Sequence, residues 1–334
     1  MAEVKDTFAS LGKIEAIRRL YEGTGFKAFD EPLEFRAAAH SLIVSASTTL
    51  LEGVDFDLVY FPYKHLGYKA VVAVCAELYA ALAHPRTLSV RLGVSAKLDY
   101  EQIAELWQGV VAAAKEHGLR SISLDLQPSR NGLSVSVSAT GETADITARR
   151  RPEAKSKDLI CVSGPLGAAY LGLQVLEREK VRFESGASKS EALEKYRMLV
   201  GAYLKPELSS KVVYALEETE IYPSYGYCVR HGLADAVIRL TRDSGLGAKI
   251  YADKIPFEGN TFALGEELDI DPVSAAMNGG EDYRLLFTVP ILKLEQFRKD
   301  FQTFDIIGHL SQPEVGAVLV TPDGVELPLK AQGW

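Results

Sequence analysis

The residues best suited to chemistry form a short acidic turn near the C-terminal end of the chain. Asn278 is followed by Gly279, Gly280, Glu281, Asp282 and Tyr283, and then by a predicted strand at 284–289. Two glycines before two carboxylates give a tight backbone with acidic groups at its rim, because glycine adopts conformations that other residues avoid. Such a rim suits ligand binding, but a simple turn with a charged tip has the same pattern. The spacing alone favours neither interpretation.

A second glycine turn lies earlier in the chain. Gly164-Pro165-Leu166-Gly167 stands between a predicted strand and a predicted helix, where backbone amides could cradle a phosphate. A plain strand–turn–helix connection explains it more simply. The sequence contains no G-x-x-x-x-G-K-[ST] phosphate loop, no G-x-S-x-G elbow and no H-x-x-x-H or H-E-x-x-H pair. A phosphate-loop nucleotide site, a serine hydrolase and a zinc site are therefore unsupported.

The composition is that of a globular protein. The 334 residues are 47% hydrophobic and 25% charged, and the formal net charge of −8 argues against broad binding to nucleic acid or anionic membranes. No apolar run approaches the roughly 20 residues needed to cross a bilayer, and residues 1–13 do not resemble a secretory signal. The odd count of three cysteines, Cys75, Cys161 and Cys228, indicates reduced thiols. We expect a cytoplasmic protein that binds neither nucleic acid nor membranes.

The first half of the chain is predicted to consist of alternating strands and helices. Short β-branched runs predict strands, and apolar residues at helical spacing predict helices. The predicted strands are 41–47, 87–94, 121–126 and 133–139, and the predicted helices are 66–84 and 100–117. The run 133–139 alternates strictly, which predicts one face on the core and one face in water.

The second half begins after a basic, proline-containing run at 149–155, which we interpret as a solvated connector, with an anion-binding edge as the alternative. We predict domains at 1–148 and 149–334. The predicted strands of the second domain are 158–162, 283–289, 305–310 and 317–320, and its helices are one from the glycine turn to about 179, then 189–203, 209–218 and 232–244. The fold class is α/β (α+β), with a mixed sheet and flanking helices in each half.

The segment GGEDYRLLFTV at 279–289 resembles the motif that marks thiamine-monophosphate kinases. Further pieces follow the family in the same order over nearly the whole chain. They are LLEGVDF at 50–56, LGYKA at 66–70, VSGPLG at 162–167, Gly232-Leu233, DSGLGAKI at 243–250 and the terminal Gly333-Trp334. An ordered set of this kind is far more specific than any one piece.

The resemblance implies a two-domain aminoimidazole ribonucleotide synthetase-like fold, in a superfamily that includes selenophosphate synthetase. It implies N-terminal domains that pair into a dimer around a shared barrel of strands, with ATP and magnesium in a cleft between the domains. The first domain would then carry the nucleotide site and dimerisation, and the second the substrate side. The family reaction moves the γ-phosphoryl group of ATP onto thiamine monophosphate. By resemblance, Gly279, Gly280, Glu281, Asp282, Tyr283 and Trp334 are substrate-binding candidates.

The sequence departs from the family at the carboxylates that hold magnesium, an ion that requires oxygen ligands. The first of five acidic motifs corresponds to Glu34–Ala38, which contains no aspartate, and the second places Thr48 after Ser47 where an acid belongs. The fifth becomes Cys228-Val229-Arg230-His231. Acids remain only at Glu77 and Asp125, which are therefore the metal-ligand candidates. We do not expect ordinary magnesium chemistry from two of five positions.

Arg36 and Arg230 place permanent positive charge where a dication would bind, since arginine does not deprotonate. An arginine beside ATP can instead neutralise phosphate charge directly. Arg151 falls near the arginine that faces the nucleotide in the family. The nucleotide- or phosphate-binding candidates by resemblance are Arg151, Ser47, Thr48, Arg230 and His231. The alternative is that both new arginines are merely exposed or salt-bridged.

Three functions stay open at this point. The first is a working thiamine-monophosphate kinase with rearranged metal ligands. The second is a non-catalytic pseudoenzyme that binds nucleotide or thiamine phosphate as a sensor or partner. The third is a structural subunit. In each case we expect a homodimer or a heterodimer with a paralogue, and in the first two a small-molecule phosphate ligand.

Overall fold

The computed structural model describes residues 8–28, 33–185 and 191–331, which form two compact units. The first unit runs to Leu78 and then from Ala83 to Ala144, and the second takes Tyr79–Leu82 and the chain from Asp145 onward. The division falls at the start of helix α5 (Asp145–Arg150), just before the basic run at 149–155.

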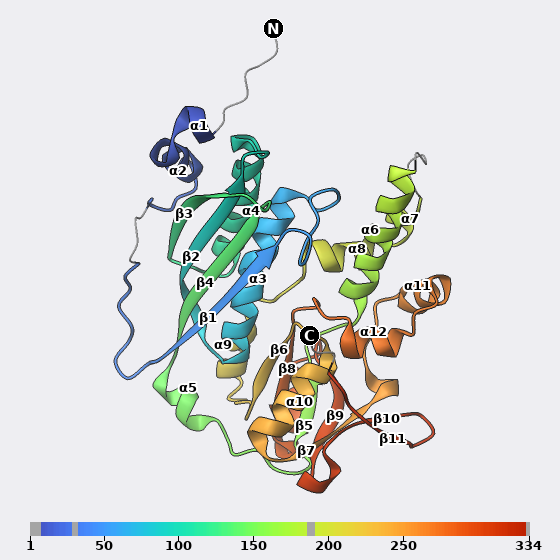
Figure 1. The fold of residues 1–334 in the computed structure, drawn as a ribbon. Helices are drawn as coiled ribbons and strands as arrows, with labels where there is room; N and C mark the ends of the chain where they lie inside the picture. Colours follow the sequence, from blue (N-terminus) through green and yellow to red (C-terminus); the bar gives the residue numbers. More distant parts are fainter. Residues whose placement is uncertain (1–7, 29–32, 186–190, 332–334) are drawn as a thin grey trace. The chain divides into compact units, whose positions relative to one another are not determined.

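The first unit contains a four-stranded sheet in the order β1-β4-β2-β3 (Figure 1). Its strands are β1 (Leu42–Leu51), β2 (His84–Ser95), β3 (Ser121–Ser129) and β4 (Ser134–Thr143). The β2–β3 pair is parallel and the other pairs are antiparallel. Its helices are α1 (Phe8–Leu11), α2 (Lys13–Tyr21), α3 (Tyr63–Ala80) and α4 (Tyr100–Glu116). The hydroxyl of Tyr21 donates to the carbonyl of Ile122 at 2.8 Å, which joins α2 to β3.

The two faces of this sheet differ in chemistry. Val135, Val137 and Ala139 of β4 are buried, and the serines between them face the other way. That second face is rich in hydroxyls, with contacts at 3.0 Å between Thr49 and Ser136 and between Ser123 and Ser89. The predicted alternation of 133–139 is therefore confirmed, because strand side chains alternate between faces.

Helices α3 and α4 cross at two glycines. A Cβ on Gly67 would lie 2.0 Å from the Leu106 carbonyl oxygen, and a Cβ on Gly109 would lie 1.8 Å from the Lys64 carbonyl oxygen. Only hydrogen fits at such distances, so these glycines permit the close approach of the two backbones.

The second unit contains a seven-stranded mixed sheet in the order β11-β10-β7-β9-β5-β8-β6 (Figure 1). Its strands are β5 (Leu159–Val162), β6 (Gly226–Val229), β7 (Gly247–Tyr251), β8 (Arg284–Val289), β9 (Asp305–Ser311), β10 (Ala317–Val320) and β11 (Glu326–Pro328). Only the β7–β10 pair is parallel. Two mixed sheets with helices confirm the predicted fold class, and the dimer barrel stays a prediction.

Helices of the second unit cover this sheet and build a separate layer around α6. After α5 they are α6 (Ala168–Glu184), α7 (Ala192–Lys195), α8 (Arg197–Leu204), α9 (Val212–Glu218), α10 (Leu233–Ser244), α11 (Thr261–Leu268), α12 (Pro272–Asn278) and α13 (Leu294–Asp300), with short 3-10 turns at Ala252–Lys254, Ile291–Lys293 and Pro313–Val315. Val237 of α10 packs in one buried cluster with Ile250 of β7 and Leu286 of β8. No helix within 8–28, 33–185 or 191–331 is long and apolar enough to cross a membrane.

The single helix predicted over 189–203 is wrong in its described part. The chain forms α7 and α8, which meet at Tyr196 (φ −110°, ψ 24°), a conformation outside the helix. The Tyr196 side chain is buried, and its hydroxyl donates to Glu267. A tertiary anchor of this kind overrides the helical spacing of the local sequence.

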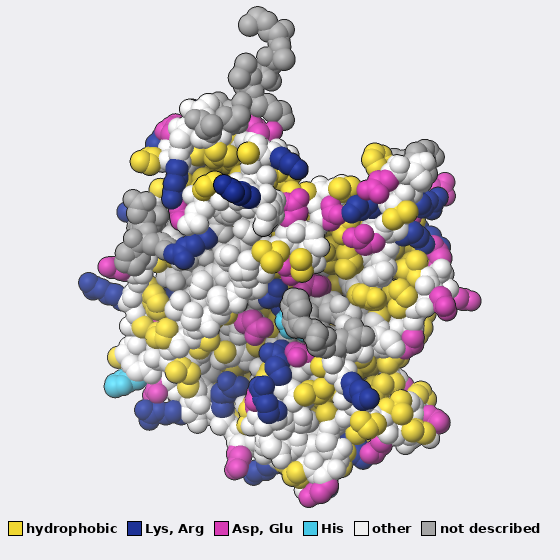
Figure 2. All heavy atoms as spheres, in the orientation of Figure 1, with side chains coloured by type: hydrophobic (Ala, Val, Ile, Leu, Met, Phe, Trp, Pro, Cys, Tyr) yellow, Lys and Arg dark blue, Asp and Glu magenta, His cyan; other side chains and the backbone are white. Residues whose placement is uncertain are grey.

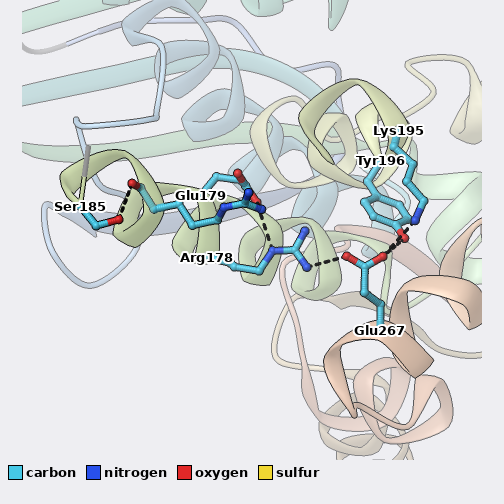
Figure 3. A network of polar contacts seen from close by, with 7 residues as sticks. Arg178, Glu179, Ser185, Lys195, Tyr196 and Glu267 are labelled. Atoms are coloured by element: carbon cyan, nitrogen blue, oxygen red, sulfur yellow. Dashed lines mark hydrogen bonds and ion pairs between the residues drawn. The ribbon is translucent and has the colours of Figure 1, made fainter. Parts of the chain in front are cut away.

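Glu267 joins three helices of this layer (Figure 3). Its carboxylate accepts hydrogen bonds from Arg178 of α6 at 2.7 Å, from Lys195 of α7 at 2.9 Å and from Tyr196. These hydrogen bonds lower the pKa of Glu267 from 4.5 to about 2, and the bond from Tyr196 contributes most. The ionised carboxylate therefore stabilises the α6–α7–α11 contact.

Replacing Gly109 by Ala tests the helix crossing. We expect G109A to lower the free energy of unfolding by about 1–3 kcal/mol or more, because the added methyl group forces α3 and α4 apart. Gly201→Ala in α8 is the matched control, since its Cβ would meet nothing within 4 Å and alanine favours helix by up to about 1 kcal/mol. Urea denaturation measures both, and equal stability of the two variants would contradict the crossing.

Replacing Glu267 by Gln tests the carboxylate junction. We expect E267Q to be less stable at neutral pH by about 1 kcal/mol or less, as for partly exposed ion pairs. The stabilisation is present above the unfolded pKa of 4.5 and is lost as the pH falls toward 2, so the gap to wild type should close in acid. Thermal melts across this pH range measure it, with Glu314→Gln as an exposed control. A gap that is independent of pH would refute the ionic contribution.

Candidate functional site

The candidate site in the second unit is built around the turn that links α12 to β8. Gly280, Glu281 and Tyr283 have φ values of 76°, 64° and 50°. The left-handed region is uncommon for residues with side chains, and Tyr283 is bulky as well. Strain of this kind persists only where surrounding structure fixes it, and it concentrates at functional sites.

The loop after β6 fixes the acidic turn from one side. The amide of Glu281 donates to the carbonyl of Arg230 at 2.7 Å, and the amide of Tyr283 donates to the carbonyl of Val229 at 3.0 Å. A Cβ on Gly280 would lie 2.6 Å from the same Arg230 oxygen. Glycine is therefore required at 280 for these two backbones to meet.

Asp282 fixes the turn from the other side. Its carboxylate, which is buried, accepts hydrogen bonds from the amides of Gly167 at 2.8 Å and Ala169 at 3.1 Å. These amides open α6, whose N-cap residue Gly167 has no side chain to satisfy them. The anion position at this helix end is thus filled by the protein's own carboxylate, and the glycine turn 164–167 serves as a connection rather than a phosphate cradle.

Burial dominates the titration of Asp282. Desolvation raises the pKa of this carboxyl from 3.8 to about 7, although the amides of Gly167 and Ala169 and the charge of Arg284 favour the ionised form. The neighbouring charge of Glu281 raises the pKa further. The two acids of the turn therefore differ in role, because Asp282 points into the fold.

Glu281 lies beside Arg230. The Arg230 Nε is 3.8 Å from Glu281 Oε1, and the two side chains are 15% and 21% exposed. The hydroxyl of Tyr283 donates to Glu281 Oε2 at 3.1 Å. Of the predicted residues, the structure thus brings together Arg230, Glu281 and Tyr283, with His231 exposed next to Arg230. Arg230 is salt-bridged, as the alternative for this residue held, and Arg36 is exposed.

The side chain of Arg151 is hydrogen-bonded to the segment that precedes β6. Its Nε donates to the carbonyl of Pro223 and its Nη2 to the carbonyl of Ser224, both at 3.0 Å. Burial lowers the pKa of Arg151, but arginine stays protonated in proteins. Its hydrogen-bond acceptors in the described chain are neutral carbonyls, so these bonds leave the positive charge uncancelled.

In the first unit, Ser47 and Thr48 extend to opposite faces of β1. Ser47 lies opposite Ser138 on the hydroxyl face, and Thr48 lies opposite the buried Val137. Ser47 borders a hollow of about 710 Å³ on the hydroxyl face, whose floor also includes Ser89 and Arg91. Hydroxyls and one guanidinium suit a polar ligand or a polar partner surface.

The structure does not bring Glu77 and Asp125 together. Glu77 belongs to α3, which packs on the apolar face of the sheet, where Leu78 approaches Gly141. Asp125 alternates with the buried Leu124 and Leu126 and so points from the other face. There it forms an ion pair with Lys13 and accepts from the Gln127 amide at 3.2 Å.

The two candidate ligands, Glu77 and Asp125, do not form a magnesium site together, because they lie on opposite faces of the sheet. Across the described ranges, no group of three or more histidines, cysteines, aspartates or glutamates is placed to hold a metal ion. Asp125 and Glu281 face Lys13 and Arg230, respectively. Lys13 is a residue that sequence reasoning missed, because no local motif links α2 to β3. Trp334 lies outside the described residues.

Known proteins resemble this chain over most of its length. The family described as AIR synthase related protein, N-terminal domain, matches residues 33–143. The thiamine-monophosphate kinase of Pyrococcus horikoshii is 26% identical over 324 residues, which cover 96% of this chain and 94% of that protein. The thiamine-monophosphate kinase of Aquifex aeolicus is 25% identical over 279 residues, covering 84% and 85%. This chain thus resembles thiamine-monophosphate kinases along most of its length.

Solved structures share the fold of this chain. Thiamine monophosphate kinase from Aquifex aeolicus superposes with a TM-score of 0.71 at 24% identity, over 88% of this chain and 92% of that one. AaThiL complexed with AMPPCP and TMP gives a TM-score of 0.73 at 24% identity over 88% of each chain. The hydrogenase maturation protein HypE of E. coli gives 0.70 at 14% identity over 96% of each chain. The fold is therefore shared beyond the thiamine-monophosphate kinases.

Replacing Asp282 by Asn tests the buried carboxylate. The native state holds this proton up to about pH 7, whereas the unfolded state releases it near 3.8. The stability contribution of the proton is therefore complete below the unfolded pKa and is lost as pH rises toward 7. We expect the free energy of unfolding of wild type, relative to D282N, to fall between about pH 5 and about pH 8.

Urea denaturation of wild type and D282N at about pH 5 and about pH 8 measures the difference in their free energies of unfolding. The control is Asp253→Asn, an exposed position, for which the difference from wild type should not change over the same range. A wild-type advantage over D282N that grows with pH would show that the amides of α6 outweigh the burial of the carboxylate.

Proposed function

We propose that this protein binds ATP and a thiamine phosphate, the ligands of the family reaction, and that it acts as a sensor or partner whose phosphoryl transfer is weak or lost. The observation that carries the binding part is the turn 279–283. Its strained backbone is held by the loop after β6 and by the end of α6, which is the rigid support that a binding loop requires.

The comparisons support the choice of ligands. The relatives that match most of this chain are thiamine-monophosphate kinases, and one structure of similar fold is AaThiL complexed with AMPPCP and TMP. We propose that Glu281 and Tyr283 lie at the substrate side. The buried Asp282 positions them through α6.

The pairing of Asp125 and Glu281 with basic side chains supports weak or lost phosphoryl transfer. In this reaction a bound magnesium ion neutralises and orients the phosphates of ATP. In the described chain, Asp125 and Glu281 are each paired with a basic side chain, which disfavours a magnesium ion beside them. We propose that Arg151 contacts a phosphate group instead, because its guanidinium faces only neutral acceptors in the described chain.

We also propose that the sheet of the first unit forms a dimer, with a second copy or with a paralogue. Among the described strands, β1 pairs with β4 alone and is therefore an edge strand, and edge strands present unpaired amides and carbonyls. The hydroxyl face beside it suits a polar contact. Figure 2 shows acidic and basic side chains interspersed on the face drawn, which fits a small ligand better than a polyanion.

The family reaction itself is the second candidate function. The likeness to thiamine-monophosphate kinases over 96% of the chain favours it. It predicts formation of thiamine diphosphate from ATP and thiamine monophosphate in the presence of magnesium.

Calorimetric titration with ATP and with thiamine monophosphate, each with and without magnesium, tests the proposal. We expect binding of both ligands and no thiamine diphosphate by chromatography. Arg151→Ala should weaken ATP binding by about tenfold or more. Arg149→Ala, an exposed neighbour paired with Asp145, should leave it unchanged, and circular dichroism confirms folding. Turnover would establish the second candidate, and no binding of either ligand would refute the proposal.

A further inference from the structure

The first unit holds a cavity of about 650 Å³ at the ends of its two parallel strands. Strands β2 and β3 run side by side until Ser95 lies opposite Ser129, where both strands end. The described walls of the cavity come from these strand ends, from the turn that leads into α4, and from the start of α1 and α2. Ligands of α/β sheets are bound outside the carboxyl ends of parallel strands, so the position of the cavity indicates a binding site.

Most of the cavity wall is apolar. Val94 of β2 and Leu126 of β3 are buried and line the cavity at the strand ends. Leu98 of the turn and Phe8 of α1 line it as well, and the Phe8 ring lies 6.2 Å from the ring of Tyr100. Cavities of this size with apolar walls and a few polar groups are the usual binding sites of small molecules.

The turn between β2 and α4 is held by its own hydrogen bonds. The amide of Leu98 donates to the carbonyl of Ser95 at 3.0 Å. The Asp99 carboxylate accepts from the Gln102 amide at 3.0 Å, and the Gln102 side chain accepts from the Asp99 amide at 2.9 Å. This reciprocal capping fixes the start of α4. A wall that is already ordered loses little conformational entropy when a ligand binds.

The charged residues at the cavity restrict the charge of a ligand. Lys13 and Lys97 both line the cavity, but Lys13 is paired with Asp125. Lys97 is exposed, and none of the ion pairs in the described chain engages it. Asp99 lines the cavity too, so a second negative charge on a ligand would be repelled. Lys97 therefore suits a single negative charge, and Asp99 disfavours a polyphosphate.

We infer that this cavity binds a small aromatic monoanion, whose planar body contacts Phe8, Leu98 and Leu126 and whose charge lies at Lys97. The Phe8 ring favours an aromatic body, which can pack against it edge-on or in an offset stack. Carboxylates on fused aromatic rings are the chemical class that the volume and the charge favour. The site belongs to the first unit alone, and it does not rest on the proposed function.

Fluorescence titration of the full chain with anilinonaphthalene sulfonate tests the inference, because this aromatic monoanion becomes brighter in apolar surroundings. Phenylnaphthylamine has the same rings without the charge and is the matched probe. We expect saturable binding of the sulfonate at a single site per chain, with a dissociation constant below about 100 µM. Circular dichroism confirms that each variant is folded.

Two substitutions separate the charge from the apolar wall. Lys97→Gln should weaken binding of the sulfonate by about twofold to fivefold, as for an exposed charge pair, and leave the neutral probe unchanged. Leu98→Asp should weaken binding of both probes by about tenfold or more, because it places a charge in the apolar wall. The matched controls are Lys64→Gln, at another exposed lysine of the first unit, and Leu292→Asp, at a leucine that is 95% exposed. Both controls should bind as wild type.

Lys97→Gln keeps the test decisive if Leu98→Asp fails to fold, because Lys97 is exposed. Binding that does not saturate, or equal affinities of wild type and the folded variants, would overturn the inference. Displacement of the sulfonate by ATP or by thiamine monophosphate would assign the cavity to the ligands of the proposed function, and would overturn a separate site. Failure of both of those ligands to bind would refute the proposed function and leave the result for the sulfonate unchanged.

Discussion

The hydrogen bonds from α6 to Asp282 hold the candidate site of the second unit in place. A carboxylate in this buried position loses its hydration, and the loss raises its pKa to about 7. Two amides at the start of α6 offset part of that loss, helped by the positive end of the helix dipole. Gly167 has no side chain that could cap α6. Asp282 therefore accepts the hydrogen bonds of the free amides at the helix start, and these amides in turn stabilise the buried carboxylate.

The rest of the turn follows from this anchor. With Asp282 directed inward, Glu281 on the other side of the backbone is directed toward Arg230, and Tyr283 enters β8 with a left-handed φ of 50°. Such a backbone would relax in an unconstrained loop. The hydrogen bonds to the carbonyls of Val229 and Arg230 prevent this. Two segments distant in sequence therefore hold each other in one rigid conformation.

Periodicity and local motifs were enough to predict the fold class, the alternation in β4 and the turn at 279–283. They failed where a tertiary contact decides, as at Tyr196, whose hydroxyl bonds to Glu267 of another helix. The two carboxylates of the turn look alike in sequence, yet Asp282 caps a helix and Glu281 faces an arginine. The two side chains differ in role because the backbone directs them to opposite sides. The residue types alone do not indicate that direction. Lys13 had no signal at all, because its partner Asp125 lies on a distant strand.

The pairing of Glu281 with Arg230 follows from an electrostatic constraint. A partly buried carboxylate such as Glu281 is unfavourable unless a positive charge or hydrogen-bond donors accompany it. In a metal site the ion meets that need, and here Arg230 and Tyr283 meet it. A chain that kept the acid without metal or arginine would leave a charge uncompensated. Once the arginine is present, a dication gains little and is repelled. The ion pair with Arg230 and the hydrogen bond from Tyr283 therefore stabilise the ionised Glu281 within the turn.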